Sequence, residues 1–185
     1  DKRWQGYGLP PISNANYAWI LHMLYHLDQV NGVAGFLLSN GALEDEDTVA
    51  IREQLIRNDK VEAIFILPAE MFYQVDLSCT LWIVNQNKKG GIKNSRKLRN
   101  RENEILFVDL RKWNNNKNTI KTDKSKKTFV TFSDEQISQI AEIYHSWQMS
   151  PTLINNQQTE LCGIATKDEI EKQGWSLTPS KYIKF

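Results

Sequence analysis

Three short apolar runs, at residues 33–38, 61–67 and 79–84, constrain the fold more than any other feature of the chain. The first run shows no alternation of polar and apolar residues, which is typical of a strand covered on both faces, as in a parallel sheet. Only about ten residues separate the second run from the third, too few for a helical crossover. We therefore predict that these two strands are antiparallel neighbours.

Helical patterns alternate with the apolar runs. Apolar residues recur at spacings of three and four between residues 17 and 27, and again between residues 49 and 56, which predicts an amphipathic helix in each segment. A further strand is predicted at 105–110. A capping-box pattern at 133–136 begins a helix that ends near Trp147, and a short helix is expected at 167–172. The order of elements predicts an α/β fold.

Composition excludes several classes of protein. A chain of 185 residues with 41% hydrophobic and 24% charged residues has enough apolar material for one domain, or one domain with a small appendage. Cys79 and Cys162 have no paired spacing, so neither a zinc site nor a disulfide framework is predicted. No apolar stretch approaches a membrane span and no signal peptide is visible, so we expect a cytoplasmic protein. The first residue is Asp1, as expected of a processed, cleaved or partial product.

The net charge of +1 does not indicate a partner, but the distribution of charge does. Seven basic residues and no acidic residue lie between positions 88 and 101. They could contact DNA phosphates near a reacting base, or form a solvated hairpin extension, and the sequence leaves both interpretations open. The seven residues are Lys88, Lys89, Lys93, Arg96, Lys97, Arg99 and Arg101.

Several segments in order resemble the modification subunit of type I restriction-modification systems, an adenine-specific DNA methyltransferase. Their order and spacing carry the resemblance, because no single segment is specific. The segments are GLPP (8–11), NANYAW (14–19), GFLLSNG (35–41), IREQLI (51–56), ILPAEMFY (66–73), TLWI (80–83) and LTPSKY (177–182).

Two motifs of that family do not occur in these residues. The family binds S-adenosylmethionine through a Gly-rich turn and holds the target amine with an Asn-Pro-Pro-aromatic motif, whereas the only consecutive prolines here, Pro10 and Pro11, follow Leu9. The resemblance implies that residue 1 lies just downstream of the catalytic motif. The runs at 33–38, 61–67 and 79–84 would then be the last three strands of a methyltransferase sheet, with an antiparallel final pair. We expect this chain alone to be inactive.

The resemblance also implies roles for four aromatic residues. The family places an aromatic just after the sixth strand against the flipped adenine, and Phe72 occupies that position, with Tyr73 as the fallback. Tyr17 and Trp19 fall where a helix approaches the adenine of the cofactor. Packing in the core is the competing interpretation for each of them.

The resemblance implies three regions: the C-terminal part of a methyltransferase domain (1–111), a Lys/Asn-rich loop (112–132) and a small helical appendage (133–185). It implies DNA, a specificity subunit and a restriction subunit as partners. The alternative is a non-catalytic assembly or DNA-binding module. His22 and His26 have helical spacing but no third ligand, so no metal site is predicted. The uncharged strand at 33–38 is expected to be an exposed edge, along which the chain either self-associates or keeps the missing half of the enzyme bound.

Overall fold

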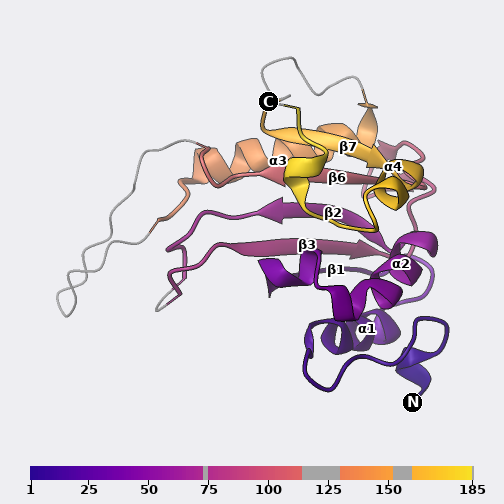
Figure 1. Ribbon diagram of the computed structural model, residues 1–185. Helices are drawn as coiled ribbons and strands as arrows, with labels where there is room; N and C mark the ends of the chain where they lie inside the picture. Colours follow the sequence, from indigo (N-terminus) through magenta and orange to yellow (C-terminus); the bar gives the residue numbers. More distant parts are fainter. Residues whose placement is uncertain (73–74, 114–129, 152–159, 185) are drawn as a thin grey trace.

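The protein is described by a computed structural model that covers residues 1–72, 75–113, 130–151 and 160–184. A five-stranded sheet with the order β1-β3-β2-β6-β7 forms its centre (Figure 1). A separate two-stranded sheet pairs β4 with β5. The strands are β1 (Val33–Ser39), β2 (Val61–Ile66), β3 (Cys79–Asn85), β4 (Gly91–Lys93), β5 (Arg96–Leu98), β6 (Glu104–Asp109) and β7 (Cys162–Thr166).

The three strands predicted from the apolar runs are present, and β2 and β3 are antiparallel neighbours as predicted. β3 is hydrogen-bonded between β1 and β2 and is antiparallel to both, so β1 and β2 run in the same direction. The pairing of Ser39 with Cys79, and of Ile66 with Thr80, brings the carboxyl ends of β1 and β2 to the same end of the sheet.

The sheet extends beyond these three strands. β6 pairs with β2 in parallel, and β7 pairs with β6 in antiparallel orientation. The segment 133–185 therefore contributes a strand to the main sheet in addition to helices. β7 was not predicted from the sequence because it is short and three of its five residues, Cys162, Gly163 and Ala165, are small. The division of the chain at residues 111 and 133 stays a prediction, and the Lys/Asn-rich segment falls almost wholly outside the described residues.

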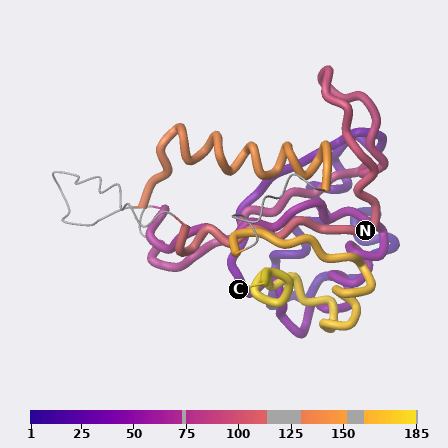
Figure 2. Tube along the Cα trace, turned by 90° about the horizontal axis from the view of Figure 1, so that it is seen from above, coloured from indigo at the N-terminus to yellow at the C-terminus, as the bar shows by residue number. Residues whose placement is uncertain are grey.

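Helices cover the two faces of the sheet unequally (Figures 1 and 2). Buried residues of α1 (Asn16–His26), α2 (Val49–Arg57) and α4 (Lys167–Lys172) belong to one core cluster with β2, β3 and β6. On the other face, α3 (Asp134–Met149) packs Ile143 and Trp147 against β2 and β6. The capping box predicted at Ser133 begins α3, since the Ser133 side chain accepts a hydrogen bond from the backbone N–H of Gln136. The part of the chain that the structure describes also contains short 3₁₀ helices: η1 (Lys2–Trp4), η2 (Asn40–Leu43), η3 (Glu46–Thr48) and η6 (Pro179–Lys181).

β1 differs from its expected burial on both faces. Its even-numbered residues pack against the first core cluster, whereas Val33 and Leu37 on the other face are 42% and 45% exposed. The reason is that α3 lies over β2 and β6 and leaves the β1 end of that face uncovered. In the described residues β1 pairs only with β3, so its outer edge is open, as the sequence analysis expected.

The β4–β5 hairpin projects from the body of the protein beyond the end of α3 (Figure 2). Lys93 pairs with Arg96, which leaves the two-residue turn Asn94-Ser95, and both turn residues have positive φ angles of 49° and 62°. Asn tolerates this conformation best among residues with a side chain, and such turns match the twist of a hairpin. The hairpin needs a glycine at its base, because a Cβ on Gly90 would lie 2.6 Å from the Arg99 carbonyl.

No helix in the described residues is long and apolar enough to cross a membrane.

Candidate nucleic-acid interface

The end of the sheet at which β1, β2 and β6 finish is called here the carboxyl edge, and the opposite end the amino edge. Ser39, Ile66 and Asp109 are the last residues of the three strands, and Ile66 pairs with Asp109. In open α/β sheets, ligands bind outside the carboxyl ends of the parallel strands. The loops that leave this edge are therefore where the chemistry of the fold is expected.

Phe72 lies in the loop that follows β2 at the carboxyl edge. The loop is closed at its base by Leu67, whose N–H donates to the Cys79 carbonyl at 2.9 Å, and at its tip by Val75, whose N–H donates to the Phe72 carbonyl at 3.1 Å. The Phe72 ring is half-buried and packs against the core cluster under α3. Phe72 is therefore held against the core without being fully enclosed by the described residues. Tyr73, the fallback, lies outside the described residues.

Tyr17 reaches the carboxyl edge from the first turn of α1 but is part of the core. Its side chain is fully buried, its hydroxyl donates to the Ala42 carbonyl at 2.6 Å, and its ring meets Trp82 edge-on at 6.2 Å. Burial raises the pKa of Tyr17 to about 12. Tyr17 thus holds the segment that follows β1. Its proximity to a cofactor stays a prediction.

Trp19 lies on the outer side of α1 and is 59% exposed. It meets His22 edge-on at 5.9 Å. His22 Nδ1 lies 3.1 Å from the Arg3 guanidinium, and His26 Nδ1 lies 2.8 Å from the His22 carbonyl. The described residues contain no group of three His, Cys, Asp or Glu side chains able to hold a metal ion.

A carboxylate and a guanidinium that the sequence analysis did not select also lie at the carboxyl edge. Asp109 ends β6, and the Arg111 guanidinium contacts its carboxylate at 2.6 Å. Burial alone would raise the pKa of Asp109, but the hydrogen bonds from Arg111 outweigh it and hold that pKa below its ordinary value. A carboxylate directly after the four apolar residues 105–108 was the available signal.

The basic run occupies the opposite end of the sheet from Phe72. It follows the last residue of β3, Asn85, which pairs with Val33 at the start of β1. Phe72 follows the last residue of β2, at the carboxyl edge. The structure therefore does not bring the basic run next to the position proposed for a reacting base. Contact between the run and DNA phosphates stays a prediction.

Lys88, the first residue of the basic run, is enclosed at the amino edge. Its ammonium group donates to the Asp59 carboxylate at 2.6 Å and to the carbonyls of Val61 and Glu104 at 3.0 and 2.7 Å. Burial lowers the pKa of Lys88, and the charge of Asp59 opposes that effect. Lys88 thus ties the starts of β2 and β6 together, and in this arrangement its cation does not reach solvent.

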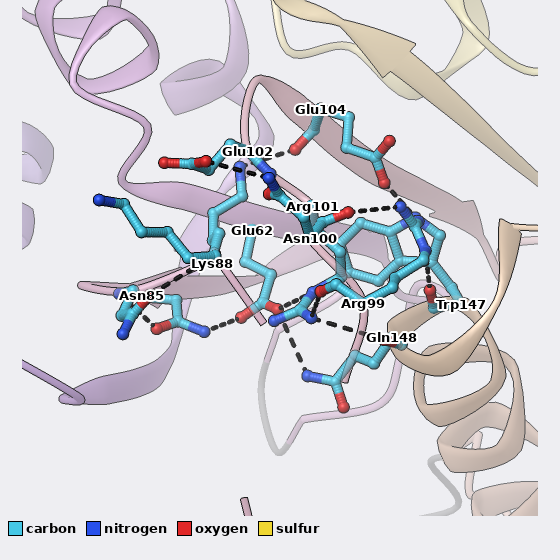
Figure 3. A network of polar contacts seen from close by, with 12 residues as sticks. Glu62, Asn85, Lys88, Arg99, Asn100, Arg101, Glu102, Glu104, Trp147 and Gln148 are labelled. Carbon is cyan, nitrogen blue, oxygen red and sulfur yellow. Dashed lines mark hydrogen bonds and ion pairs between the residues drawn. The ribbon is translucent and has the colours of Figure 1, made fainter. Parts of the chain in front are cut away.

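Arg101, the last residue of the run, is also buried and belongs to a network centred on Glu62 (Figure 3). Glu62 accepts hydrogen bonds from Arg101 Nε at 3.1 Å, from Asn85 Nδ2 at 2.6 Å and from Gln148 Nε2 at 3.3 Å. The neighbouring Arg99 pairs with the Glu104 carboxylate and donates from Nε to the Trp147 carbonyl at 2.8 Å. The network fastens the base of the hairpin to β2 and to the end of α3.

The remaining cations of the run are accessible to different degrees. Lys89 and Lys97 are exposed, while Lys93, Arg96 and Arg99 are half-buried. In β5, Arg96 and Leu98 lie on one face and Lys97 on the other. The part of the run that could meet a phosphate from solvent is therefore the hairpin itself.

Comparison with solved structures defines the class of protein. A methyltransferase subunit of the type I restriction-modification system from Streptococcus thermophilus superposes with a TM-score of 0.73 and 25% identity, over 100% of this chain and 34% of that chain. The EcoKI M protein superposes with a TM-score of 0.61 and 18% identity, over 90% of this chain and 37% of that chain, and shares its fold. The sheet is thus part of a methyltransferase fold.

The sequence defines the family. The profile of the N-6 DNA methylase family matches residues 1–185, and the chain belongs to that family. It is 34% identical to the type I restriction enzyme HindI methylase subunit of Haemophilus influenzae, over 99% of this chain and 37% of that protein. It is 33% identical to the MjaIX methylase subunit of Methanocaldococcus jannaschii, over 95% of this chain and 28% of that protein. The chain thus spans about a third of the length of these relatives, and the resemblance found in the sequence is confirmed.

Proposed function

We propose that this chain is part of a type I restriction-modification DNA methyltransferase subunit. The subunit would transfer a methyl group from S-adenosylmethionine to the N6 amine of adenine in DNA. Membership of the N-6 DNA methylase family supports this assignment. The main structural support is the strand order β1-β3-β2, in which β3 runs antiparallel to both of its neighbours. Phe72 lies in the loop that follows β2, where the proposed function needs an aromatic residue.

The chemistry requires the adenine to leave the duplex. The lone pair of its exocyclic amine is delocalised into the ring, so the base must be held flat and the amine aimed at the methyl donor. Flipping a base costs a few kcal/mol, and a stack against one aromatic ring returns roughly 1–3 kcal/mol. A ring that is half-buried and half-open, as Phe72 is, is suited to this stack because the core fixes its orientation.

We infer that this chain does not hold S-adenosylmethionine by itself. The Tyr17 hydroxyl is committed to the Ala42 carbonyl, and its ring is fully buried. Trp19 points outward, and no strand of the described sheet is followed by a Gly-rich turn. In the proposed subunit, the cofactor would supply the methyl group and would be held mainly by residues outside 1–185. This chain would supply the wall against which the base stacks.

Replacing Phe72 with Ala in the complete subunit tests the proposal. We expect the affinity for the flipped adenine to fall by about 10- to 100-fold, which corresponds to the loss of one base–aromatic stack. Fluorescence of 2-aminopurine at the target position reports the capture, and transfer of a labelled methyl group reports the reaction. Phe72→Trp keeps an aromatic face and should restore most of the signal.

Leu77→Ala is the matched control. Leu77 lies in the same loop and is 77% exposed, so its loss removes apolar surface without removing an aromatic face. Equal 2-aminopurine fluorescence in wild type, Phe72→Ala and Leu77→Ala would remove Phe72 from the base site and direct attention to Tyr73.

The partners we propose are DNA, a specificity subunit that reads the target sequence, and a restriction subunit. The more accessible cations at the hairpin, Lys89, Lys93, Arg96 and Lys97, would add sequence-independent affinity for DNA phosphates, whereas Arg99 is already paired with Glu104. The open edge of β1 supports pairing with another strand, either from the rest of the subunit or from a second copy. A subunit of this kind would act in the cytoplasm, where bacterial and archaeal DNA lies.

A non-catalytic assembly or DNA-binding module is the second candidate function. The basic hairpin at the amino edge favours it, because this hairpin lies away from the edge at which methyl transfer would occur. A subunit that binds duplex DNA but transfers no methyl group, even with its specificity partner present, would support this alternative.

A further inference from the structure

A pocket of about 400 Å³ lies at the amino edge, under the β4–β5 hairpin. Its walls come from three parts of the fold: the start of β1 (Val33), the hairpin (Ile92, Arg96) and the end of α3 (Tyr144, Gln148), with Arg101 from the return of the hairpin. The volume is within the range of pockets that bind small ligands. The pocket is distinct from the carboxyl edge, so it has no part in the reaction proposed above.

The charge of the pocket wall is one-sided. Lys93, Arg96 and Arg101 line it, and none of the described lining residues is an Asp or a Glu. The charge of Arg101 is balanced by its ion pair with Glu62, which does not line the pocket. Lys93 donates to the Asn31 carbonyl, which carries no net charge. Among the described residues no ion pair involves Arg96.

Buried donors in the wall lack partners. The Arg101 side chain is buried, with Nε bound to Glu62 and Nη1 to the Arg99 carbonyl at 2.6 Å, but Nη2 has no hydrogen-bond partner within the part of the chain that the structure describes. The same is true of Arg96 Nη1 and of the acceptor Gln148 Oε1. Buried polar atoms in native proteins nearly always have partners, so the two unpartnered guanidinium donors, Arg96 Nη1 and Arg101 Nη2, point to a ligand that accepts hydrogen bonds.

The chemistry of these atoms selects the class of ligand. Arg96 Nη1 and Arg101 Nη2 are guanidinium N–H donors without a hydrogen-bond partner among the described residues, although Arg101 Nε is paired with Glu62, and two such donors suit a group with several oxyanion oxygens. From these observations we infer that the pocket under the hairpin binds a phosphoryl group through Arg96 and Arg101. The group could belong to free phosphate or to a phosphate of a nucleic-acid backbone. This inference stands independently of the proposed methyltransferase activity.

Arg96→Gln is the test variant, and Lys97→Gln is its matched control. Both remove one positive charge from adjacent residues of β5, but Arg96 lines the pocket whereas Lys97 is exposed on the other face. Arg96 has no ion pair among the described residues, so its replacement should not disturb the fold. Inorganic phosphate is the first probe, titrated calorimetrically into the purified protein at constant ionic strength.

We expect saturable binding of phosphate to the wild type and to Lys97→Gln. Binding to Arg96→Gln should be at least about tenfold weaker, as for the loss of one charge-assisted hydrogen bond. Thermal unfolding of each variant verifies that it is folded. Absence of phosphate binding to the wild type, together with equal behaviour of the two variants toward DNA, would overturn the inference.

A second titration with a short duplex distinguishes the two sources of the group. If the pocket holds a backbone phosphate, free phosphate should compete with the duplex, and Arg96→Gln should reduce the salt slope of DNA binding by about one while Lys97→Gln changes it less. If the pocket holds free phosphate, phosphate should bind without displacing DNA. Equal reductions in DNA affinity for both variants, without phosphate binding, would mean that the hairpin acts only as a charged surface.

Discussion

Arg101 Nε lies 3.1 Å from Glu62 Oε1, and both side chains are almost completely buried. The pair joins the start of β2 to the chain that returns from the hairpin, 39 residues later. Removing two charges from water is costly, and the cost is offset here by Asn85 and Gln148, which also donate to Glu62. The pair therefore fixes where the hairpin emerges from the sheet.

Glu62→Gln should destabilise the fold strongly. It leaves the Arg101 cation buried without its counter-charge, and loss of one partner of a buried pair typically costs about 3–5 kcal/mol. Urea unfolding followed by circular dichroism measures the loss. Glu53→Gln is the matched control, because Glu53 pairs with Arg57 on the exposed surface of α2 and its loss should leave the urea midpoint nearly unchanged. Equal midpoints for the two variants would mean that Glu62 is not a structural centre.

Tyr17 should make stability depend on pH in the alkaline range. Burial raises its pKa from 10.0 to about 12 in the folded protein. The stabilisation is therefore fully present below pH 10 and is lost as the pH rises toward 12, because the unfolded chain releases the phenolic proton first. A shift of two units corresponds to roughly 2–3 kcal/mol.

Tyr17→Phe isolates this effect from other phenols whose pKa burial also raises, such as Tyr144. The variant should lose about 1 kcal/mol near neutral pH with the hydrogen bond to the Ala42 carbonyl. Its unfolding free energy should then fall less between pH 10 and 12 than that of the wild type. Parallel pH profiles for the two proteins would contradict the assignment.

The open edge of β1 should drive association of residues 1–185 when they are produced alone. Leu37→Lys places a charge on the uncovered face of the edge strand and should reduce the apparent mass in light scattering. Leu9→Lys is the control, since Leu9 is 80% exposed and lies outside the strand. A wild-type monomer at high concentration, with slowly exchanging β1 amides on the side away from β3, would indicate an edge covered from within.

Residues 1–185 alone should not bind S-adenosylmethionine measurably. They contain neither an Asn-Pro-Pro-aromatic motif nor a Gly-rich turn after a described strand, and the Tyr17 phenol is committed to the core. Calorimetric titration of the cofactor into the chain is the measurement. Tight binding would show that the described residues build a cofactor site that their contacts do not reveal.

The sequence predicted the fold where a pattern had one physical solution. The short link between residues 67 and 79 could only join antiparallel strands, and Ser133 could be recognised as a cap because its partner Gln136 follows at the required spacing. The parallel pairing of β6 with β2 and the addition of β7 depend on contacts between distant segments. No local pattern predicts such contacts.

The candidate site was harder to predict, because the type of a residue does not tell whether its side chain faces the core or the solvent. Lys88 and Lys89 are adjacent lysines, yet Lys88 is buried on Asp59 and Lys89 is exposed. Tyr17 and Trp19 are two residues apart on α1, so one faces the core and the other faces solvent. The unpartnered atoms of the pocket under the hairpin could be found only with the packing of α3 in place.

The placement of Phe72 and the hairpin at opposite ends of the sheet sets a minimum footprint on DNA. The six residues of β2 span about 17 Å at the usual rise of a strand. Phosphates along one DNA strand are spaced by about 3.4 Å along the helix axis. A duplex that reached both places at once would therefore meet the hairpin about five nucleotides or more from the flipped adenine. Removing the charge of a DNA phosphate at that distance should change the affinity for DNA but not the choice of base.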